Sequence, residues 1–222
     1  MFDFDGVIVD SEIIYNAALA DVLTDLGHAV TAEEAIDRYA GYRWSECHRM
    51  IEEAAARRFD ADALGKAVDE AVAARVGEIL AIEGIGMFLE AQAHRKLGIA
   101  SSSEQGWLEE MVERLGFTRF FAGNIISGAA IPRGKPHPDV YLQAAERLGV
   151  KPAECLVIED HPIGVAAGAA AGMTVISLLA ARHIRDGHEE KVRAAGAHHV
   201  ARSYREVAEI LERLERDVMA SV

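Results

Sequence analysis

Short apolar runs alternate with amphipathic stretches over the second part of the chain, and this alternation restricts the fold more than any other feature. The apolar runs are LGIAS (97–101), NIIS (124–127), CLVIED (155–160), MTVIS (173–177) and a weaker AHHVA (197–201). The helical stretches run from about Gln105 to Leu115, Pro138 to Leu148, Ile163 to Ala171, His188 to Ala195 and Ser203 to Leu214. Strands that alternate with helices in this way form a parallel sheet with helices on both faces. The sequence therefore predicts an α/β protein.

Residues 11–83 differ, because no strand pattern occurs there. Helices are predicted from Ser11 to Gly27, from Thr31 onward, from about Trp44 to Arg58 and from about Asp62 to Leu80. Thr31, followed three residues later by Glu34, forms the capping-box pattern, and Ser11 is expected to cap its own helix. We therefore expect a helical cap domain, residues 11–83, inserted into a core domain formed by residues 1–10 and 84–222.

The chain opens with MFDFDGVIVDSE, an apolar stretch that carries two aspartates one residue apart. If Phe2 to Phe4 form a strand, Asp3 and Asp5 share one face and emerge at its carboxyl end, where open parallel sheets bind ligands. A divalent cation or a shared proton would offset their repulsion. A chance D-x-D pair in a loop is the alternative. Only three positions precede the loop that holds Asp5, fewer than a buried strand usually has, which is consistent with missing residues ahead of Met1.

Three further sites follow predicted strands. Ser101, with Ser102 and Ser103, could hold an anionic oxygen or could simply cap the next helix. In GKPHPD (134–139), Lys135 is either a cation held by a stiff turn or a solvated surface group. Glu159 and Asp160 end the run CLVI, and if this strand lies beside the first they meet Asp3 and Asp5. Oxygen ligands of this kind suit Mg²⁺.

The charge of the chain restricts its partners. The formal net charge is −13, which argues against a nucleic acid, because binding phosphate backbones needs clustered Lys and Arg. A small phosphorylated substrate stays possible, because one local group of cations can invert the field in a cleft. No apolar run approaches 18 residues and no basic-then-apolar leader occurs, so we expect no membrane partner and a cytoplasmic location.

Four motifs in order resemble those of the haloacid dehalogenase-like hydrolase superfamily: DxDGVxxDSE, a serine after the next core strand, GKPHPD, and ED before a small-residue helix. Within the superfamily the chain is similar to the branch that contains phosphoglycolate phosphatase, sugar-phosphate phosphatases and β-phosphoglucomutase. The resemblance covers essentially the whole chain. It implies a Rossmann-like parallel sheet with an inserted helical cap.

The resemblance also implies roles for matching residues. Asp3 would be the nucleophile that forms an aspartyl-phosphate, and Asp5 would act as the general acid and base. Ser101 and Lys135 would bind the transferring phosphoryl oxygens, with Ser102 also contacting substrate. Mg²⁺ would be held by Asp3, the backbone carbonyl of Asp5 and Asp160, with Glu159 nearby.

Departures from the mutase pattern favour a phosphatase. Tyr15 stands where β-phosphoglucomutases carry a histidine, and Glu104 stands where they carry a lysine or arginine. His161 replaces the serine usual after the acidic pair, and a metal-ligand role for it is disfavoured because Mg²⁺ prefers oxygen.

The cap gives one specificity signal, the stretch Ala40–Trp44. Arg43 could hold a carboxylate, hydroxyl or second phosphate of the substrate, with Trp44 packing on the substrate. The alternative is that Arg43 is a surface residue and Trp44 a core residue. We therefore expect an Mg²⁺-dependent phosphatase of a small phosphorylated metabolite, monomeric or weakly dimeric. A phosphomutase and a non-catalytic regulatory protein on the same fold are the alternatives.

Overall fold

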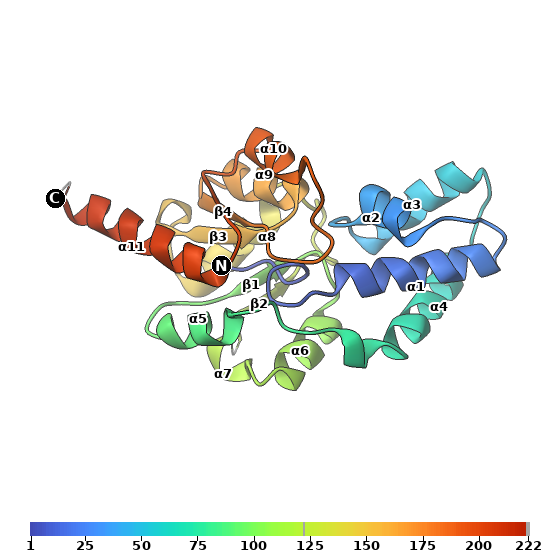
Figure 1. Cartoon of the computed structure of the whole chain (residues 1–222), viewed down its shortest axis with the longest axis horizontal. Helices are drawn as coiled ribbons and strands as arrows, with labels where there is room; N and C mark the ends of the chain where they lie inside the picture. Colours follow the sequence, from blue (N-terminus) through green and yellow to red (C-terminus); the bar gives the residue numbers. More distant parts are fainter. Residues whose placement is uncertain (122, 221–222) are drawn as a thin grey trace.

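The computed structural model describes residues 1–121 and 123–220, and within them five parallel strands form the centre of the protein (Figure 1). The strands are β1 (Ile99–Ser101), β2 (Ile125–Ser127), β3 (Leu156–Glu159), β4 (Thr174–Leu178) and β5 (His199–Ala201). β1 pairs with β2, and β3 pairs with β4, which in turn pairs with β5. The predicted α/β class and the parallel sheet are confirmed.

The amino-terminal residues join these two groups of strands. Phe2 forms a parallel bridge to Ile99 of β1 on one side and to Ile158 of β3 on the other. Backbone hydrogen bonds of 2.9 Å run from Phe2 to Gly98 and from Asp3 to Ile158. The predicted strand from Phe2 to Phe4 is wrong in length, because Phe4 already accepts the hydrogen bonds of a turn. The first three residues nevertheless occupy the middle of the sheet.

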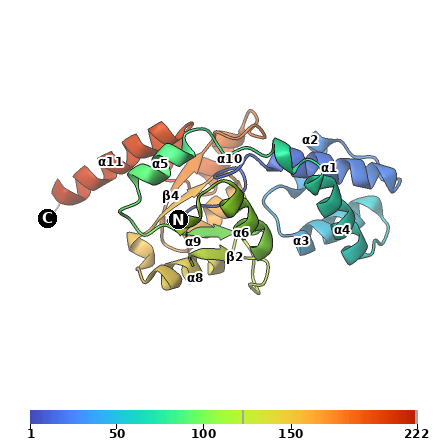
Figure 2. The same cartoon turned by 90° about the horizontal axis from the view of Figure 1, so that it is seen from below.

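Helices cover both faces of the sheet (Figure 2). They are α5 (Ile85–Ala91), α6 (Gln105–Arg114), α7 (Thr118–Phe121), α8 (Asp139–Leu148), α9 (Pro162–Ala170), α10 (His188–Ala194) and α11 (Tyr204–Ala220), with short 3₁₀ turns at Val76–Glu78 and Pro152–Glu154. Successive strand residues face opposite sides. Val157 and Val175 therefore pack with α8, α9 and α10, whereas Ile158 and Ile176 pack with α5, α6 and α11. Two apolar cores result.

Residues 12–73 contain four helices joined by loops and lie to one side of the sheet (Figure 1). They form α1 (Glu12–Asp25), α2 (Ala32–Tyr39), α3 (Trp44–Ala55) and α4 (Ala61–Ala73), and α1 contacts both α2 and α4. The two connections to the sheet run side by side, because Asp10 donates to the Leu80 carbonyl and Ile82 donates to that of Ile8, both at 2.9 Å. That residues 11–83 form a separate domain stays a prediction.

Helix ends predicted from short sequence patterns are confirmed only in part. Thr31 and Glu34 form the predicted capping box. Ser11 does stand before α1, but its side chain makes no capping bond, and the helix predicted to reach Arg58 ends at Ala55, because Ala56 adopts a left-handed conformation. The short helices α5 and α7 were not predicted. Among the described helices, none is both long enough and apolar enough to cross a bilayer.

Candidate active site

Asp3 lies at the carboxyl end of the central segment, beside the ends of β1 and β3. Its backbone amide donates to the Ile158 carbonyl, which fixes the residue, and only 8% of it is exposed. Its Oδ1 has no hydrogen bond among the described residues, but it forms an ion pair of 3.0 Å with Lys135 Nζ. The nucleophile candidate therefore has a buried and incompletely satisfied carboxylate.

Lys135 projects from the loop before α8 and is almost fully buried. Its Nζ lies 2.7 Å from Glu159 Oε1 as well as 3.0 Å from Asp3, and it sits over the Tyr141 ring. Burial opposes the charge, but the carboxylates of Asp3 and Glu159 outweigh burial and raise the pKa of the amine. Lys135 is therefore a fixed cation, as one of the two alternatives predicted, and not a solvated lysine.

Both carboxylate oxygens of Glu159 are engaged by the protein. Oε1 accepts from Lys135 and, at 3.0 Å, from the Tyr141 hydroxyl. Oε2 accepts from the backbone amides of Asp160 (2.9 Å) and His161 (3.0 Å) at the start of α9. Burial disfavours the charge, but Lys135 and these hydrogen bonds lower the pKa of Glu159. The side chain is held as an anion.

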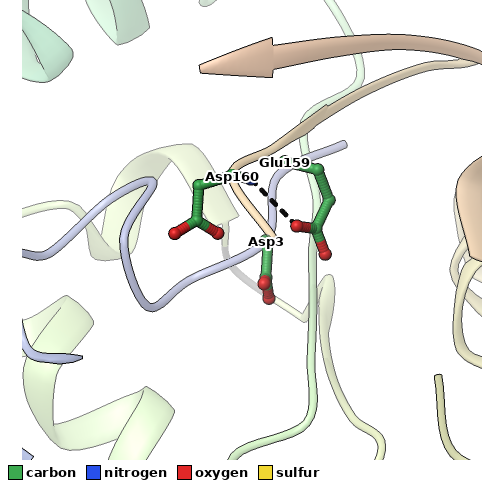
Figure 3. A group of neighbouring side chains, drawn as sticks. All are labelled: Asp3, Glu159 and Asp160. Carbon is green, nitrogen blue, oxygen red and sulfur yellow. Dashed lines mark hydrogen bonds between the residues drawn. The ribbon is translucent and has the colours of Figure 1, made fainter. Parts of the chain in front are cut away.

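Asp160 brings a third carboxylate to the same place (Figure 3). One ligand atom from each of Asp3, Glu159 and Asp160 lies within 4.8 Å of the others. Burial, followed by repulsion from Glu159, raises the pKa of both Asp3 and Asp160 well above the usual range. A bound cation would offset that repulsion, and buried carboxylate oxygens suit Mg²⁺. The donor set therefore fits a divalent metal ion.

Asp5 points to a different set of partners. Ser11 donates to Asp5 Oδ1 at 2.5 Å, and Ser103 donates to Oδ2 at 2.6 Å. Ser103 was named in the sequence analysis only together with Ser101 and Ser102, and its contact with Asp5 was not predicted, because three consecutive serines give no local signal of which one turns toward Asp5. Ser11 was expected to cap α1, yet its hydroxyl reaches back to this carboxylate instead.

The other two serines of the loop after β1 also have partners. Ser101 is 1% exposed, and its hydroxyl accepts from the Ser103 amide at 3.1 Å. Ser102 donates to the Gly41 carbonyl of the cap at 3.5 Å. The residue before α6 is Glu104, which makes no side-chain capping bond. The alternative that these serines only cap the next helix is therefore wrong.

Arg43 links the helical segment to the sheet. Its Nη1 donates to the Ile131 carbonyl at 2.7 Å, and its Nε lies 3.4 Å from Glu46. A Cβ on Gly134 would fall 2.6 Å from the same Nε, so the guanidinium lies directly over the loop that carries Lys135. Arg43 is therefore not a surface arginine. Trp44 is partly buried and packs against Gly65 of α4, and a contact of either residue with substrate stays a prediction.

Three residues beside the site were not predicted from the sequence. Tyr141 bonds Glu159, and His183 Nε2 lies 3.0 Å from Asp160 Oδ2. Glu12 Oε1 accepts from the Gly41 amide at 3.3 Å, and burial raises the pKa of this carboxyl to about 7. Tyr141 had the spacing of an ordinary apolar helix face, and His183 stands in a stretch with no motif, so no sequence signal marked these two residues.

His161 lies at the contact between the sheet and the helical segment. A Cβ on Gly41 would fall 2.6 Å from His161 Nδ1, and this atom accepts from the Ile163 amide at 3.4 Å. Burial lowers the pKa of the imidazole to about 4, which leaves it neutral near pH 7. The ring therefore supports the cap loop.

Comparison with known proteins agrees with this geometry. A family model described as haloacid dehalogenase-like hydrolase matches residues 1–178. Hexitol phosphatase B of Escherichia coli K12 is 31% identical over 185 residues, covering 79% of this chain and 81% of the relative. The 6-phosphogluconate phosphatase of the same organism is 29% identical over 185 residues, with 82% of each chain covered. A conserved haloacid dehalogenase-like protein of unknown function from Agrobacterium tumefaciens superposes with a TM-score of 0.81 at 30% identity, covering 96% of this chain and 97% of that one.

Proposed function

The chain belongs to the haloacid dehalogenase-like hydrolase family and is a phosphatase, and from this premise we propose that it hydrolyses a small phosphorylated metabolite with Mg²⁺ through an aspartyl-phosphate. The observation that carries the proposal is the shared ion pairing of Lys135 with Asp3 and Glu159, in the buried group that also holds Asp160. Phosphoryl transfer needs positioned groups and compensated charge more than covalent chemistry. This group supplies both.

In the proposed reaction, an Asp3 carboxylate oxygen attacks phosphorus and forms the aspartyl-phosphate while the bond to the leaving oxygen breaks. Asp5, oriented by Ser11 and Ser103, donates a proton to that leaving oxygen. The ionised Asp5 then takes a proton from a water molecule, which attacks phosphorus and releases phosphate from Asp3. The two steps return both carboxyl groups to their starting states.

Mg²⁺ would be held by Asp3 and Asp160, together with the backbone carbonyl of Asp5. The ion would supply positive charge to the phosphoryl oxygens. The hydrogen bonds to both Glu159 oxygens favour a different use of that carboxylate, which is to hold Lys135 toward Asp3 and to anchor the start of α9. Glu159 would then act mainly as a positioning residue, near the metal.

The substrate would lie between the sheet and the helical segment. Lys135 and Ser101 would bind the transferring phosphoryl group, and Ser102, Arg43 and Trp44 would approach the remainder of the substrate. The names of the two Escherichia coli relatives support a phosphorylated sugar derivative. They also favour release of phosphate over the isomerisation expected of a phosphomutase.

Phosphate release from a panel of sugar and short-acid phosphates, with Mg²⁺ or with EDTA, tests the proposal. Asp3→Asn should abolish release, whereas Asp37→Asn, on an exposed face of α2, should leave it unchanged. Acid quenching during turnover, followed by peptide mass spectrometry, should find phosphate on the peptide that contains Asp3. Release by Asp3→Asn at the wild-type rate would overturn the nucleophile, and undiminished release in EDTA would overturn the metal.

A further inference from the structure

The segment that joins β4 to α10 lies against the candidate metal site and is anchored on both sides of His183. Before it, the Arg182 amide donates to Asp10 Oδ1 at 3.2 Å, and the Arg182 guanidinium pairs with the same carboxylate. After it, His188 at the start of α10 has its Nε2 2.7 Å from the Asp160 carbonyl oxygen. These contacts fix the backbone from which the His183 side chain projects.

The His183 imidazole is buried beside the Asp160 carboxylate. Its Nε2 lies 3.0 Å from Asp160 Oδ2, and its side chain is 2% exposed. Within the described part of the chain, neither ring nitrogen makes a well-directed hydrogen bond. Buried polar groups in this condition are few in folded proteins, and each calls for an explanation other than stability. The position of the ring at Asp160 supplies a candidate explanation.

The three carboxylates of the site differ in how firmly the protein holds them. Lys135 pairs with Asp3, and four hydrogen bonds hold the two oxygens of Glu159. The Asp160 carboxylate accepts no hydrogen bond from another side chain within residues 1–121 and 123–220, and His183 is its single ion-pair partner there. The orientation of the Asp160 carboxylate therefore depends on His183.

The same imidazole lies beside the backbone proposed to present a further metal ligand. Gly6 has a φ of +76°, and a Cβ there would fall 1.9 Å from Asp160 Oδ2 and 2.9 Å from His183 Cε1. The peptide bond between Asp5 and Gly6, whose carbonyl would hold Mg²⁺, thus packs closely against both side chains. His183 consequently adjoins two of the three groups proposed to bind the ion.

We propose that His183 is a positioning residue for the metal site: its Nε2–H holds the Asp160 carboxylate in the orientation that binds Mg²⁺, and its ring supports the peptide bond between Asp5 and Gly6. The proposal rests on the proposed function, because the ion belongs to that site. Groups that orient metal ligands in this way contribute about 10- to 100-fold to metal affinity or activity. Ordinary core packing is the alternative, and it requires the volume of the ring but not its nitrogen.

Three substitutions separate the nitrogen from the volume. His183→Gln places an amide nitrogen near the position of Nε2, whereas the shorter side chain of His183→Asn reaches only that of Nδ1. His183→Leu keeps an apolar side chain and has no donor. His94→Leu makes the same change at an exposed position after α5 and is the control.

Isothermal titration of the metal-free protein with Mg²⁺, without substrate, measures the role of His183 directly. We expect Kd to rise by about 10- to 100-fold in His183→Leu and His183→Asn, and to stay near the wild-type value in His183→Gln and His94→Leu. A wild-type Kd in both His183→Leu and His183→Asn overturns the proposal, and so does an equal weakening in all three His183 variants. The comparison of glutamine with asparagine decides the matter alone where His183→Leu does not unfold cooperatively on heating.

Turnover supplies a second measurement. His183→Asn should need more Mg²⁺ for half-maximal phosphate release, yet it should recover most of the wild-type kcat at saturating Mg²⁺ with an unchanged KM for the ester, because its defect lies in metal binding. A reduced kcat that saturating Mg²⁺ does not restore, together with a wild-type Kd for Mg²⁺, contradicts the positioning role.

The two proposals fail in different ways. If the wild-type protein binds no Mg²⁺ and releases phosphate equally well in EDTA, the proposed metal is overturned and this inference with it. If the wild type hydrolyses esters with Mg²⁺ and the His183 variants bind the ion as tightly as the wild type does, the inference alone is overturned.

Discussion

Lys135 Nζ lies 2.7 Å from Glu159 Oε1, and both side chains are buried beneath the carboxyl edge of the sheet. The lysine also faces Asp3, so one cation compensates two carboxylates that come from distant parts of the chain. Charges removed from water are tolerated only when they are paired and hydrogen-bonded. The stability of the protein and the proposed chemistry therefore depend on the same few atoms.

Replacing Lys135 with methionine should abolish activity and lower the free energy of unfolding by about 3–5 kcal/mol, because Glu159 and Asp3 would stay buried without their cation. Urea denaturation measures the loss. Lys66→Met is the control, since the Lys66 side chain is 77% exposed and its ion pair with Glu70 is 3.8 Å long, so its effect should stay below about 1 kcal/mol. Equal losses in the two variants would contradict the compensating role of Lys135.

Replacing Gly164 with alanine should destabilise the protein by about 1–3 kcal/mol or more and reduce activity, because the new Cβ would fall 1.5 Å from Glu159 Oε1. Gly106→Ala is the matched helical control in α6. A Cβ there meets nothing within 4 Å, so this change should stabilise the protein by about 0.5–1 kcal/mol. Thermal unfolding of both variants checks the prediction. A stabilised Gly164→Ala protein would mean that Glu159 does not pack against α9 as described.

Replacing Glu12 with glutamine should change how stability depends on pH in the metal-free protein. Burial raises the pKa of Glu12 in the folded state from 4.5 to about 7, so the folded state holds this proton more tightly than the unfolded state does. The contribution of Glu12 to stability is therefore greatest below pH 4.5, falls as the pH rises toward 7, and is constant above it.

Glutamine cannot ionise, so the variant should match the wild type near pH 4 and exceed its unfolding free energy by about 1–3 kcal/mol at pH 8. Denaturant titrations at several pH values in EDTA provide the measurement. Asp37→Asn serves as the control, since Asp37 is exposed on α2. Parallel pH profiles for wild type and Glu12→Gln would show that the Glu12 carboxyl is not perturbed.

Adding Mg²⁺ should raise the melting temperature, because the proposed site would bind the ion in the folded protein, and the ion would offset the repulsion between Asp3 and Asp160. At a concentration about 100 times Kd the gain is about 2.7 kcal/mol. Asp160→Asn should lose this gain while its metal-free form is at least as stable as the wild type, since removing one carboxylate relieves the repulsion that raises the pKa of both residues. Calorimetry with and without Mg²⁺ measures the melting temperatures of the wild type and of Asp160→Asn. A rise in melting temperature with Mg²⁺ that persists in Asp160→Asn would exclude Asp160 as a ligand.

The sequence predicted the sheet well because each strand carries its own apolar run and each run ends in polar residues. Asp3, Ser101 and Glu159 each follow such a run, and parallel strands bring those ends to one edge. Capping at Thr31 also depends on neighbouring residues in the chain. These features are local, so one sequence is enough to predict them.

The remaining features depend on contacts between distant residues. The reach of Arg43 to Ile131, the choice of Ser103 for Asp5 and the contact of His183 with Asp160 all join segments that no local pattern relates. Ser11 illustrates the difference: its position before a helix predicts a cap, yet the nearby carboxylate of Asp5 is the better acceptor for its hydroxyl. In these cases the partner of the side chain is set by the tertiary structure and not by the residues next to it in the sequence.

The central position of the first three residues constrains how the protein is made. The backbone groups on either side of Asp3 belong to residues 98–100 and 156–158, which are synthesised long after it. During synthesis residues 1–3 stay unpaired until β3 has been made, and only then can they pair with both β1 and β3. A truncated product that stops before Asp160 should consequently have no hydrolytic activity at all, however well its helical part is formed.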